Sequence, residues 1–255
     1  MDMKTGIIGG GRITRIFLQA LKNNHESLNR FSVFDVNNEV TERLKSQFSE
    51  IDICSLDTTA SQDVVIIALH PPVIVETLDK IKANIKDRTQ IVSFAPKITI
   101  AKISDTLGGI TRIIRMIPNA PSIIGKGYNP ACFSEAFSEE EKKEYYDFFS
   151  PMGETLEVEE SKLEAYAITA AMGPTYLWFQ LYKLAELSID FGLNKNETSD
   201  AIKKMVSGSV DTMFSEYTKE EVLDLIPVKP IGDHEAEILN AYDTKLNGLY
   251  NKLKS

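Results

Sequence analysis

The sequence predicts an α/β protein in which a doubly wound, mostly parallel sheet is followed by an all-helical domain. In the first 158 residues, short apolar runs alternate with amphipathic segments, which is typical of βαβ units around a buried sheet. A glycine-rich stretch follows the first of these runs, where a strand and a helix would meet. Beyond residue 158 the strand signals largely stop and apolar residues recur at helical spacing. We therefore expect two domains, residues 1–158 and residues 159–255, divided where the period changes.

The expected strands share a continuous run of apolar residues, which predicts burial on both faces of the sheet. In chain order the strands are KTGIIG (4–9), RFSVFD (30–35), DVVIIAL (63–69), TQIVSF (89–94), TRIIRMI (111–117) and ETLEV (154–158), and the first two crossover helices are expected at 13–24 and 39–50. A further helix should begin at Ser138, because Ser138 and Glu141 have the spacing of a capping box. Gly127 and Pro130 indicate a turn between these elements.

The C-terminal part of the chain predicts three helical segments. Apolar residues recur at helical spacing over 161–193, 196–217 and 234–253. The stretch TYLWFQLY at 175–182 holds too many large side chains for a single helix face. Packing in a core or between subunits explains such a stretch better than a stacking platform for a ligand.

Composition limits the classes of partner. The formal charge is −9, so a nucleic-acid backbone or an anionic membrane surface would on average be repelled, and we expect neither as a partner. No apolar run approaches the roughly 20 residues of a membrane helix. Cys54 and Cys132 lie far apart without the spacing of zinc ligands, so no metal site is expected and a reducing, cytoplasmic location is the default.

The glycine stretch GIIGGGRIT predicts a phosphate-binding turn of the Rossmann type. Gly9 and Gly11 stand where a G-x-G-x-x-G motif has its first two glycines, with Gly10, Arg12 and Ile13 around them. Free backbone N–H groups at a helix start favour a pyrophosphate. The third glycine is replaced by a threonine at position 14, which implies a less close helix–strand contact. The alternative is a tight turn with a structural role only.

Asp35 ends the second predicted strand, at the place where an acidic side chain would accept hydrogen bonds from the adenosine ribose. A carboxylate there would oppose the 2′-phosphate of NADP, at a cost of roughly 1 to 4 kcal/mol for unit charges ~4 Å apart. We therefore expect NAD or NADP as cofactor, with NAD slightly favoured. The alternative is that Asp35 only caps the turn.

Further motifs follow in order: DVVIIALHPP, IIRMIPNAPSIIGKG, GETLEVE and ITAAMGPTYLWF. With the N-terminal glycine turn, they give the sequence a resemblance to the pyrroline-5-carboxylate reductase family along almost its whole length. Residues 115–121 carry the most specific part of it. The resemblance implies an enzyme of proline biosynthesis that passes a hydride from NAD(P)H to the C=N carbon of a cyclic imino acid, and a homodimer, in some cases assembled further, formed through the helical domain.

The resemblance also assigns residues by position. It places Ala68, His70, Pro71 and Ala95 beside the nicotinamide ribose, Asn119 under the nicotinamide, and Gly173, Pro174 and Thr175 at the start of a helix that faces the substrate. A protonated imine is already an electrophile, so the protein mainly has to orient the reactants and exclude water. An obvious nucleophile–base pair is therefore not expected.

The chain departs from the family in its substrate loop, where KPIGDH (229–234) replaces small residues. Lys229 is a candidate anchor for the substrate carboxylate, Gly232 and Asp233 are candidate substrate contacts, and His234 is a candidate general acid for the imine nitrogen. The alternatives are a surface lysine and a solvated histidine at a helix start. His70 stands where the family usually has lysine, and Lys97 stands where a glycine is common.

Three functions stay open at this point. The first is reduction of pyrroline-5-carboxylate to proline. The second is an oxidoreductase of the same fold with another imine or a hydroxy acid as substrate, which the changed loop motivates. The third is a nucleotide-binding protein without catalysis.

Overall fold

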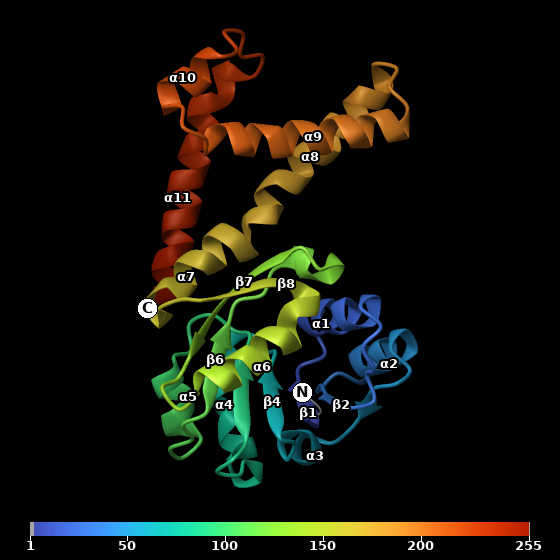
Figure 1. Cartoon of the computed structure of the whole chain (residues 1–255), viewed down its shortest axis with the longest axis vertical. Helices are drawn as coiled ribbons and strands as arrows, with labels where there is room; N and C mark the ends of the chain where they lie inside the picture. Colours follow the sequence, from blue (N-terminus) through green and yellow to red (C-terminus); the bar gives the residue numbers. More distant parts are fainter. Residues whose placement is uncertain (1–2, 255) are drawn as a thin grey trace. The chain divides into compact units, whose positions relative to one another are not determined.

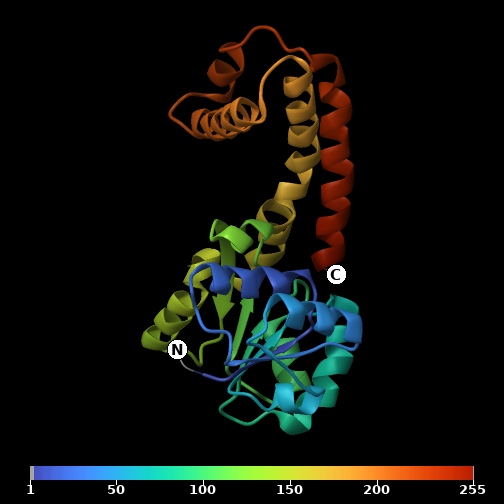
Figure 2. The same cartoon turned by 90° about the vertical axis from the view of Figure 1, so that its right-hand side faces the viewer.

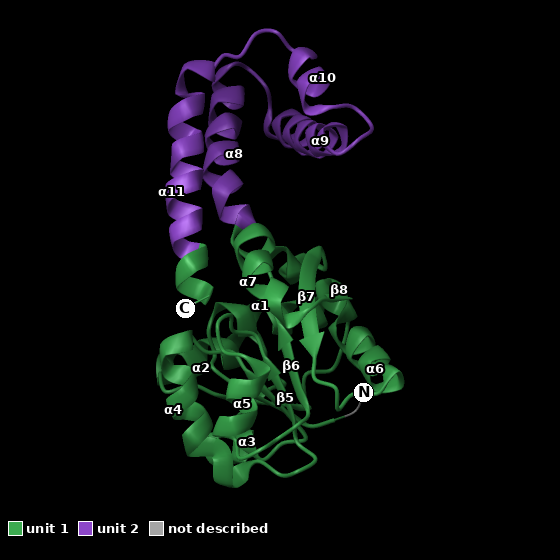
Figure 3. Cartoon of the chain, turned by 90° about the vertical axis from the view of Figure 1, so that its left-hand side faces the viewer, with its two compact units in different colours: residues 1–172, 250–255 green, residues 173–249 purple. Residues whose placement is uncertain are grey.

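The computed structural model describes residues 3–254 and divides the chain into two compact units (Figures 1 and 3). Unit 1 comprises residues 1–172 and 250–255, and unit 2 comprises residues 173–249. The change of period near residue 158 marks the end of the last strand, yet the units divide after Met172. The reason is that the first helical turns beyond the sheet pack on unit 1, where Leu163 and Ala167 are buried with Ile117.

Unit 1 is built on one sheet of eight strands, in the order β3-β2-β1-β4-β5-β6-β7-β8. The strands are β1 (Thr5–Ile8), β2 (Phe31–Phe34), β3 (Asp52–Ile53), β4 (Val64–Ile67), β5 (Gln90–Ser93), β6 (Ile113–Met116), β7 (Gly127–Phe133) and β8 (Gly153–Glu157). Every neighbouring pair is parallel except β6 and β7, which are antiparallel. The chain runs from β1 out to β3 and then returns to β4 on the other side of β1. This reversal is the switch point at which doubly wound sheets bind ligands.

The expected α/β architecture, with a Rossmann-type sheet and a helical C-terminal region, is therefore confirmed. The prediction of a turn at Gly127 and Pro130 is wrong, because both residues lie within β7. A strand containing proline and glycine carries little strand signal, and only its pairing with β6 and β8 reveals it.

Helices cover both faces of the sheet. The helices of unit 1 are α1 (Arg12–Asn23), α2 (Asn38–Gln47), α3 (Leu56–Ala60), α4 (Pro71–Ile81), α5 (Ile100–Thr106), α6 (Glu139–Phe149) and α7 (Leu163–Tyr166), with 3-10 turns at Lys82–Asn84, Ala120–Ile124, Ser150–Met152 and Glu160–Lys162 and a π-helix at Ala167–Ala171. Successive strand residues point to opposite faces, so Ile7 packs with Phe17 and Phe149, whereas Ile8 packs with Ile74. Two apolar layers result, one on each side of a buried sheet.

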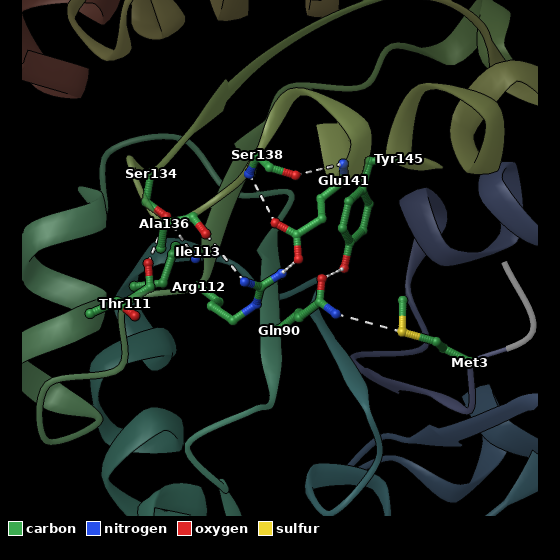
Figure 4. A network of polar contacts seen from close by, with 10 residues as sticks. All are labelled: Met3, Gln90, Thr111, Arg112, Ile113, Ser134, Ala136, Ser138, Glu141 and Tyr145. Carbon is green, nitrogen blue, oxygen red and sulfur yellow. Dashed lines mark hydrogen bonds and ion pairs between the residues drawn. The ribbon is translucent and has the colours of Figure 1, made fainter. Parts of the chain in front are cut away.

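Helix α6 begins at the predicted capping box and is fastened to the sheet. The Glu141 backbone N–H donates to the Ser138 hydroxyl, and the Ser138 backbone N–H donates to the Glu141 carboxylate over 2.9 Å. Arg112, just before β6, forms an ion pair with the same carboxylate (Figure 4). Further along α6, the Tyr145 hydroxyl donates to the Gln90 side-chain oxygen over 2.6 Å. These bonds tie α6 to the starts of β5 and β6. The starts of these strands lie at the end of the sheet opposite the carboxyl end of β1.

Unit 2 is all helical. Its helices are α8 (Gly173–Asp190), α9 (Lys195–Met213), α10 (Lys219–Asp224), a 3-10 turn at Gly232–His234 and α11 (Glu235–Lys254), whose last turn belongs to unit 1. Helices α8 and α11 overlap in the view of Figure 2 but diverge in that of Figure 1, and the rings of Tyr176, near the start of α8, and Tyr242 of α11 meet edge to face at 5.8 Å. Within residues 3–254, we find no helix with the length and apolar character that crossing a membrane requires.

Candidate dinucleotide site

The glycine turn leaves the carboxyl end of β1 in a backbone conformation that requires its first glycine. Gly9 has φ +106°, and a Cβ there would lie 2.4 Å from the carbonyl oxygen of Ala68. The Gly9 N–H donates to the carbonyl of Phe34 over 2.8 Å, so the turn is held between the ends of β2 and β4. By contrast, a Cβ on Gly11 would have no neighbour within 4 Å. The open space over Gly11, at the start of α1, could hold a pyrophosphate.

Thr14 closes this turn from within. Its side chain is fully buried, and its hydroxyl donates to the carbonyl oxygen of Gly9. Threonine at this position therefore has a structural role of its own. Its hydroxyl satisfies a carbonyl that the sharp turn removes from the β-sheet ladder.

Asp35 follows β2 and points to the glycine turn. One carboxylate oxygen accepts the N–H of Gly10 over 2.7 Å, and the other accepts the N–H of Asn37 over 2.9 Å. A carboxylate oxygen has lone pairs beyond the one used here, so both oxygens can still accept a ribose hydroxyl. Asp35 thus links the glycine turn to the segment that follows β2.

A cavity of about 680 Å³ opens above these elements. The predicted cofactor residues that line it are Gly10, Gly11, Arg12, Ile13, Ala68, His70, Pro71 and Ala95. His70 and Pro71 begin α4, so a second helix N-terminus borders the same cavity. Gly9 and Asp35 lie behind the lining, where they shape the turn. A cavity of this size and lining suits a dinucleotide in extended form.

Several lining residues carried no recognised signal in the sequence. They are Arg15, Val40, Arg43, Leu44, Gln47, Leu69, Phe94, Pro96, Met172 and Leu253. Arg15 and Arg43 stand out because, with Arg12, they place three guanidinium groups at one cavity. In the part of the chain that the structure describes, no carboxylate forms an ion pair with any of the three. The first turn of α1 also lacks acidic residues. The positive charge of the arginines and of the helix start therefore suits the cavity to phosphate groups.

Asn119 is not among the residues that line the cavity. Its side-chain amide donates to the carbonyl of Ala170 over 3.3 Å, and its backbone N–H donates to the Asn129 side chain over 3.3 Å. It joins the turn after β6 to the π-helix that leads to Met172. The structure thus places Asn119 as a support for one wall of the cavity.

The predicted substrate residues lie in unit 2 and do not share one hollow there. Lys229 and Gly232 line a groove of about 690 Å³ between α9, α10 and α11, whereas Thr175 lines a separate groove of about 490 Å³ between α8 and α11. Gly173 and Pro174 form the first turn of α8. The substrate loop and the start of α8 are therefore separate features of unit 2.

Lys229 and His234 of the substrate loop are exposed and lie near carboxylates of α11. The Lys229 ammonium lies 3.9 Å from the Glu235 carboxylate, and His234 Nδ1 lies 3.7 Å from the Glu237 carboxylate. Asp233 belongs to the short turn that precedes α11. With a side chain 70% exposed, His234 is free to rotate towards a ligand or away from it.

Comparison with known proteins agrees with this geometry. The family model described as NADP oxidoreductase, coenzyme F420-dependent, matches residues 4–97, the strands and turns that form the cavity. A pyrroline-5-carboxylate reductase of Corynebacterium melassecola is 25% identical over 218 residues, covering 84% of this chain and 80% of that protein. The Escherichia coli enzyme of the same name is 21% identical over 211 residues, covering 82% of this chain and 78% of that protein.

The chain is similar to pyrroline-5-carboxylate reductases over most of its length. The resemblance seen in the motifs is thereby confirmed. Among solved structures, the Plasmodium falciparum pyrroline carboxylate reductase with NADP bound has a TM-score of 0.76 at 19% identity, and covers 99% of this chain and 97% of that chain. The Streptococcus pyogenes 1-pyrroline-5-carboxylate reductase has a TM-score of 0.74 at 19% identity, covering 100% and 99%. At these identities the structural likeness establishes the fold.

Proposed function

We propose that this protein is an NAD(P)H-dependent oxidoreductase that reduces pyrroline-5-carboxylate to proline. The observation that carries the proposal is the cavity at the switch point of the sheet, with its glycine turn and three arginines that form no ion pair within residues 3–254, in a chain similar to pyrroline-5-carboxylate reductases. A cavity alone suits many dinucleotide enzymes. The similarity in sequence across both units selects the C=N reductases among them.

The residues of the cavity fit NAD(P)H. The space over Gly11 and the N-terminus of α1 would hold the pyrophosphate, with Arg12 beside it. Asp35 would receive the adenosine ribose, and Ala68, His70, Pro71 and Ala95 would border the other ribose. When bound, the cofactor supplies a hydride to the imine carbon, and the imine nitrogen keeps or gains one proton. The amine product and NAD(P)⁺ leave, so the reaction balances without any further redox partner.

The protein's own part is orientation and exclusion of water. The cavity walls near Ala95 and Met172 are apolar, which shields a hydride donor from solvent. We assign the substrate side to unit 2, where Lys229 would anchor the carboxylate and His234 would supply the proton, with Gly173, Pro174, Thr175, Gly232 and Asp233 around the substrate. No pair of residues in unit 1 has to act as nucleophile and base, because the imine is itself electrophilic.

We further propose a homodimer formed through unit 2. Several large apolar side chains of α8 are exposed in the single chain, among them Trp178 at 46%, Phe179 at 69% and Tyr182 at 72%. An exposed apolar surface of this kind marks an association site. A second copy would bury it, and a larger assembly could be built from such dimers. The cytoplasmic location stays a prediction from the cysteines.

A second candidate is a reductase of the same fold with a different imine or a hydroxy acid as substrate. The pairs Lys229–Glu235 and His234–Glu237 favour it, because they make the substrate loop strongly polar. A substrate with an additional cationic or polar group would suit these side chains better than unsubstituted pyrroline-5-carboxylate.

The test is the loss of reduced-nicotinamide absorbance with purified protein, pyrroline-5-carboxylate, and NADH or NADPH in parallel. We expect turnover with pyrroline-5-carboxylate. Binding of NAD(P)H without turnover on that substrate, together with turnover on a larger imine or a hydroxy acid, would support the second candidate. Tight binding without turnover on any member of the panel would support a protein that binds nucleotide without catalysis.

A further inference from the structure

The loop after β5 contains a non-glycine residue with a left-handed backbone. Lys97 has φ +79°, a conformation that side-chain-bearing residues adopt only when their surroundings hold them there. It directly follows Ala95 and Pro96, two residues that line the dinucleotide cavity. Any force that holds Lys97 in place therefore also fixes the position of this cavity wall.

A buried carboxylate holds Lys97. Its backbone N–H donates to Oε1 of Glu164 over 3.0 Å. The same oxygen accepts from Nη2 of Arg115 over 2.7 Å. The side chains of Arg115 and Glu164 are 1% and 10% exposed, so the contact is shielded from water. A charge-assisted bond in such surroundings is short and directional.

Arg115 holds a second carboxylate in the same way. Its Nη1 donates to Oε1 of Glu160 over 2.8 Å, and that oxygen accepts the backbone N–H of Ile100 over 2.7 Å. Ile100 begins α5 and is not part of the cavity lining. The two glutamates are thus matched in their bond to Arg115 and in their bond to a backbone N–H. They differ in whether that N–H belongs to the loop at the cavity.

We propose that Glu164 is a positioning residue for the cofactor. It acts through Lys97, keeping the Ala95–Pro96 wall in the shape that receives the nicotinamide end. The direction follows from topology. With the pyrophosphate at the turn after β1 and the adenosine towards β2, the other end of the dinucleotide extends towards β4 and β5. This inference rests on the proposed dinucleotide site, and it concerns one end of that site only.

Binding of whole and truncated nucleotides tests the proposal. Intact NADH and NADPH would contact the loop, whereas ADP and 2′,5′-ADP lack both the second ribose and the nicotinamide and reach only the glycine turn and the adenosine side. The variants are Glu164→Met and the matched control Glu160→Met, each of which removes one carboxylate from Arg115. Dissociation constants come from fluorescence for the reduced cofactors and from calorimetry for the fragments, with thermal unfolding measured alongside.

We expect Glu164→Met to raise the dissociation constant of intact NAD(P)H by about tenfold or more, the equivalent of one charge-assisted hydrogen bond. The dissociation constants of the fragments should stay within about twofold of the wild-type values. Glu160→Met should leave the dissociation constants of all four ligands within about threefold of the wild-type values, although the thermal unfolding temperature of this variant also falls. Equal losses for intact cofactor and fragments in Glu164→Met, or equal behaviour of the two variants, would overturn the proposal. If the wild-type protein binds none of the four ligands, the dinucleotide site itself is refuted.

Two further variants keep the proposal testable if Glu164→Met does not fold. Glu164→Gln retains an oxygen that can accept the Lys97 N–H, so it should keep more affinity for intact NAD(P)H than the methionine variant. Lys97→Gly removes the backbone strain, because glycine adopts φ +79° readily. Glu164→Gln should therefore cost less affinity for intact NAD(P)H in the Lys97→Gly background than in the wild type. An equal loss of affinity in both backgrounds would count against the role of Lys97.

Discussion

Alanine at Gly9 and alanine at Gly11 should separate the folding role of the glycine turn from its binding role. At Gly9, φ is +106°, which costs a non-glycine residue about 1 to 3 kcal/mol. The new methyl would lie 2.4 Å from the Ala68 carbonyl oxygen and 2.9 Å from the carbonyl carbon. Ala68 cannot easily retreat, because its own N–H donates to the carbonyl of Ile8 over 2.8 Å.

Strain and overlap together predict that Gly9→Ala lowers the free energy of unfolding by roughly 3 kcal/mol, or the unfolding temperature by about 6–12 °C. Gly11→Ala behaves differently. Gly11 has φ −72° and open space around its Cβ position, so its alanine variant should stay within about 1 kcal/mol of the wild type. The methyl group that Gly11→Ala adds would occupy the space proposed for the pyrophosphate and weaken the binding of NAD(P)H by about tenfold or more.

Thermal unfolding followed by circular dichroism and NAD(P)H binding followed by fluorescence would measure both effects on the same samples. The reasoning is refuted if Gly9→Ala unfolds within about 1 °C of the wild type, since the overlap then has an easy escape. It is also refuted if Gly11→Ala binds NAD(P)H as tightly as the wild type, because the open space over Gly11 would then not be the phosphate cradle.

Three other expectations concern charge and assembly. Asp35→Asn should raise the kcat/KM ratio of NADPH over NADH by about fivefold or more, because it removes a negative charge near the 2′-phosphate, and an unchanged ratio in steady-state assays would place Asp35 away from the ribose. The Glu141 pKa lies below its ordinary value because the Ser138 backbone N–H and Arg112 stabilise the carboxylate, so its contribution to stability is present above pH 4.5 and is lost as the pH falls through the lowered pKa. Urea unfolding of Glu141→Gln should accordingly depend less on pH below 4.5 than the wild type does, and identical pH profiles would contradict the network in Figure 4. Phe179→Asp should convert the proposed dimer to monomer in light scattering, whereas the same change at the exposed Lys143 of α6, in unit 1, should not.

Burial on both faces explains five of the six strands that were predicted. These five are mostly buried and carry apolar runs, because a buried parallel sheet leaves that mark in the sequence. The sixth, β8, was also expected within a few residues of its bounds, although none of its residues is buried. Strand β3 has two residues, both exposed, and leaves no such mark. Strand β7 contains the fully buried Asn129, whose side chain accepts the Ser122 hydroxyl over 2.7 Å. A polar residue whose partner comes from tertiary contact appears in the sequence as part of a loop.

The cofactor cavity was predictable where it depends on local backbone and hidden where it depends on packing. The glycine turn and Asp35 were found because each forms a fixed pattern with its own strand. Arg43 lies in the segment ERLKS, where a charge most simply indicates a solvated helix face. Only the placement of α2 next to the glycine turn, with Val40 and Leu44 packed around Gly10, turns that face towards the cavity. Met172 and Leu253 line it from distant parts of the chain.

Lys97 shows why a departure from a family pattern cannot be interpreted one position at a time. A lysine in place of a common glycine suggests a changed pocket, yet the backbone there still has the φ that favours glycine. Glu164, 67 residues further along, supplies the bond that keeps it so. A buried ion pair such as Arg115–Glu164 adds little net stability over an apolar pair of the same shape. At this turn it places the oxygen of Glu164 that accepts the Lys97 N–H. The chain can therefore carry lysine at this turn because Arg115 and Glu164 hold the backbone that glycine would otherwise adopt unaided.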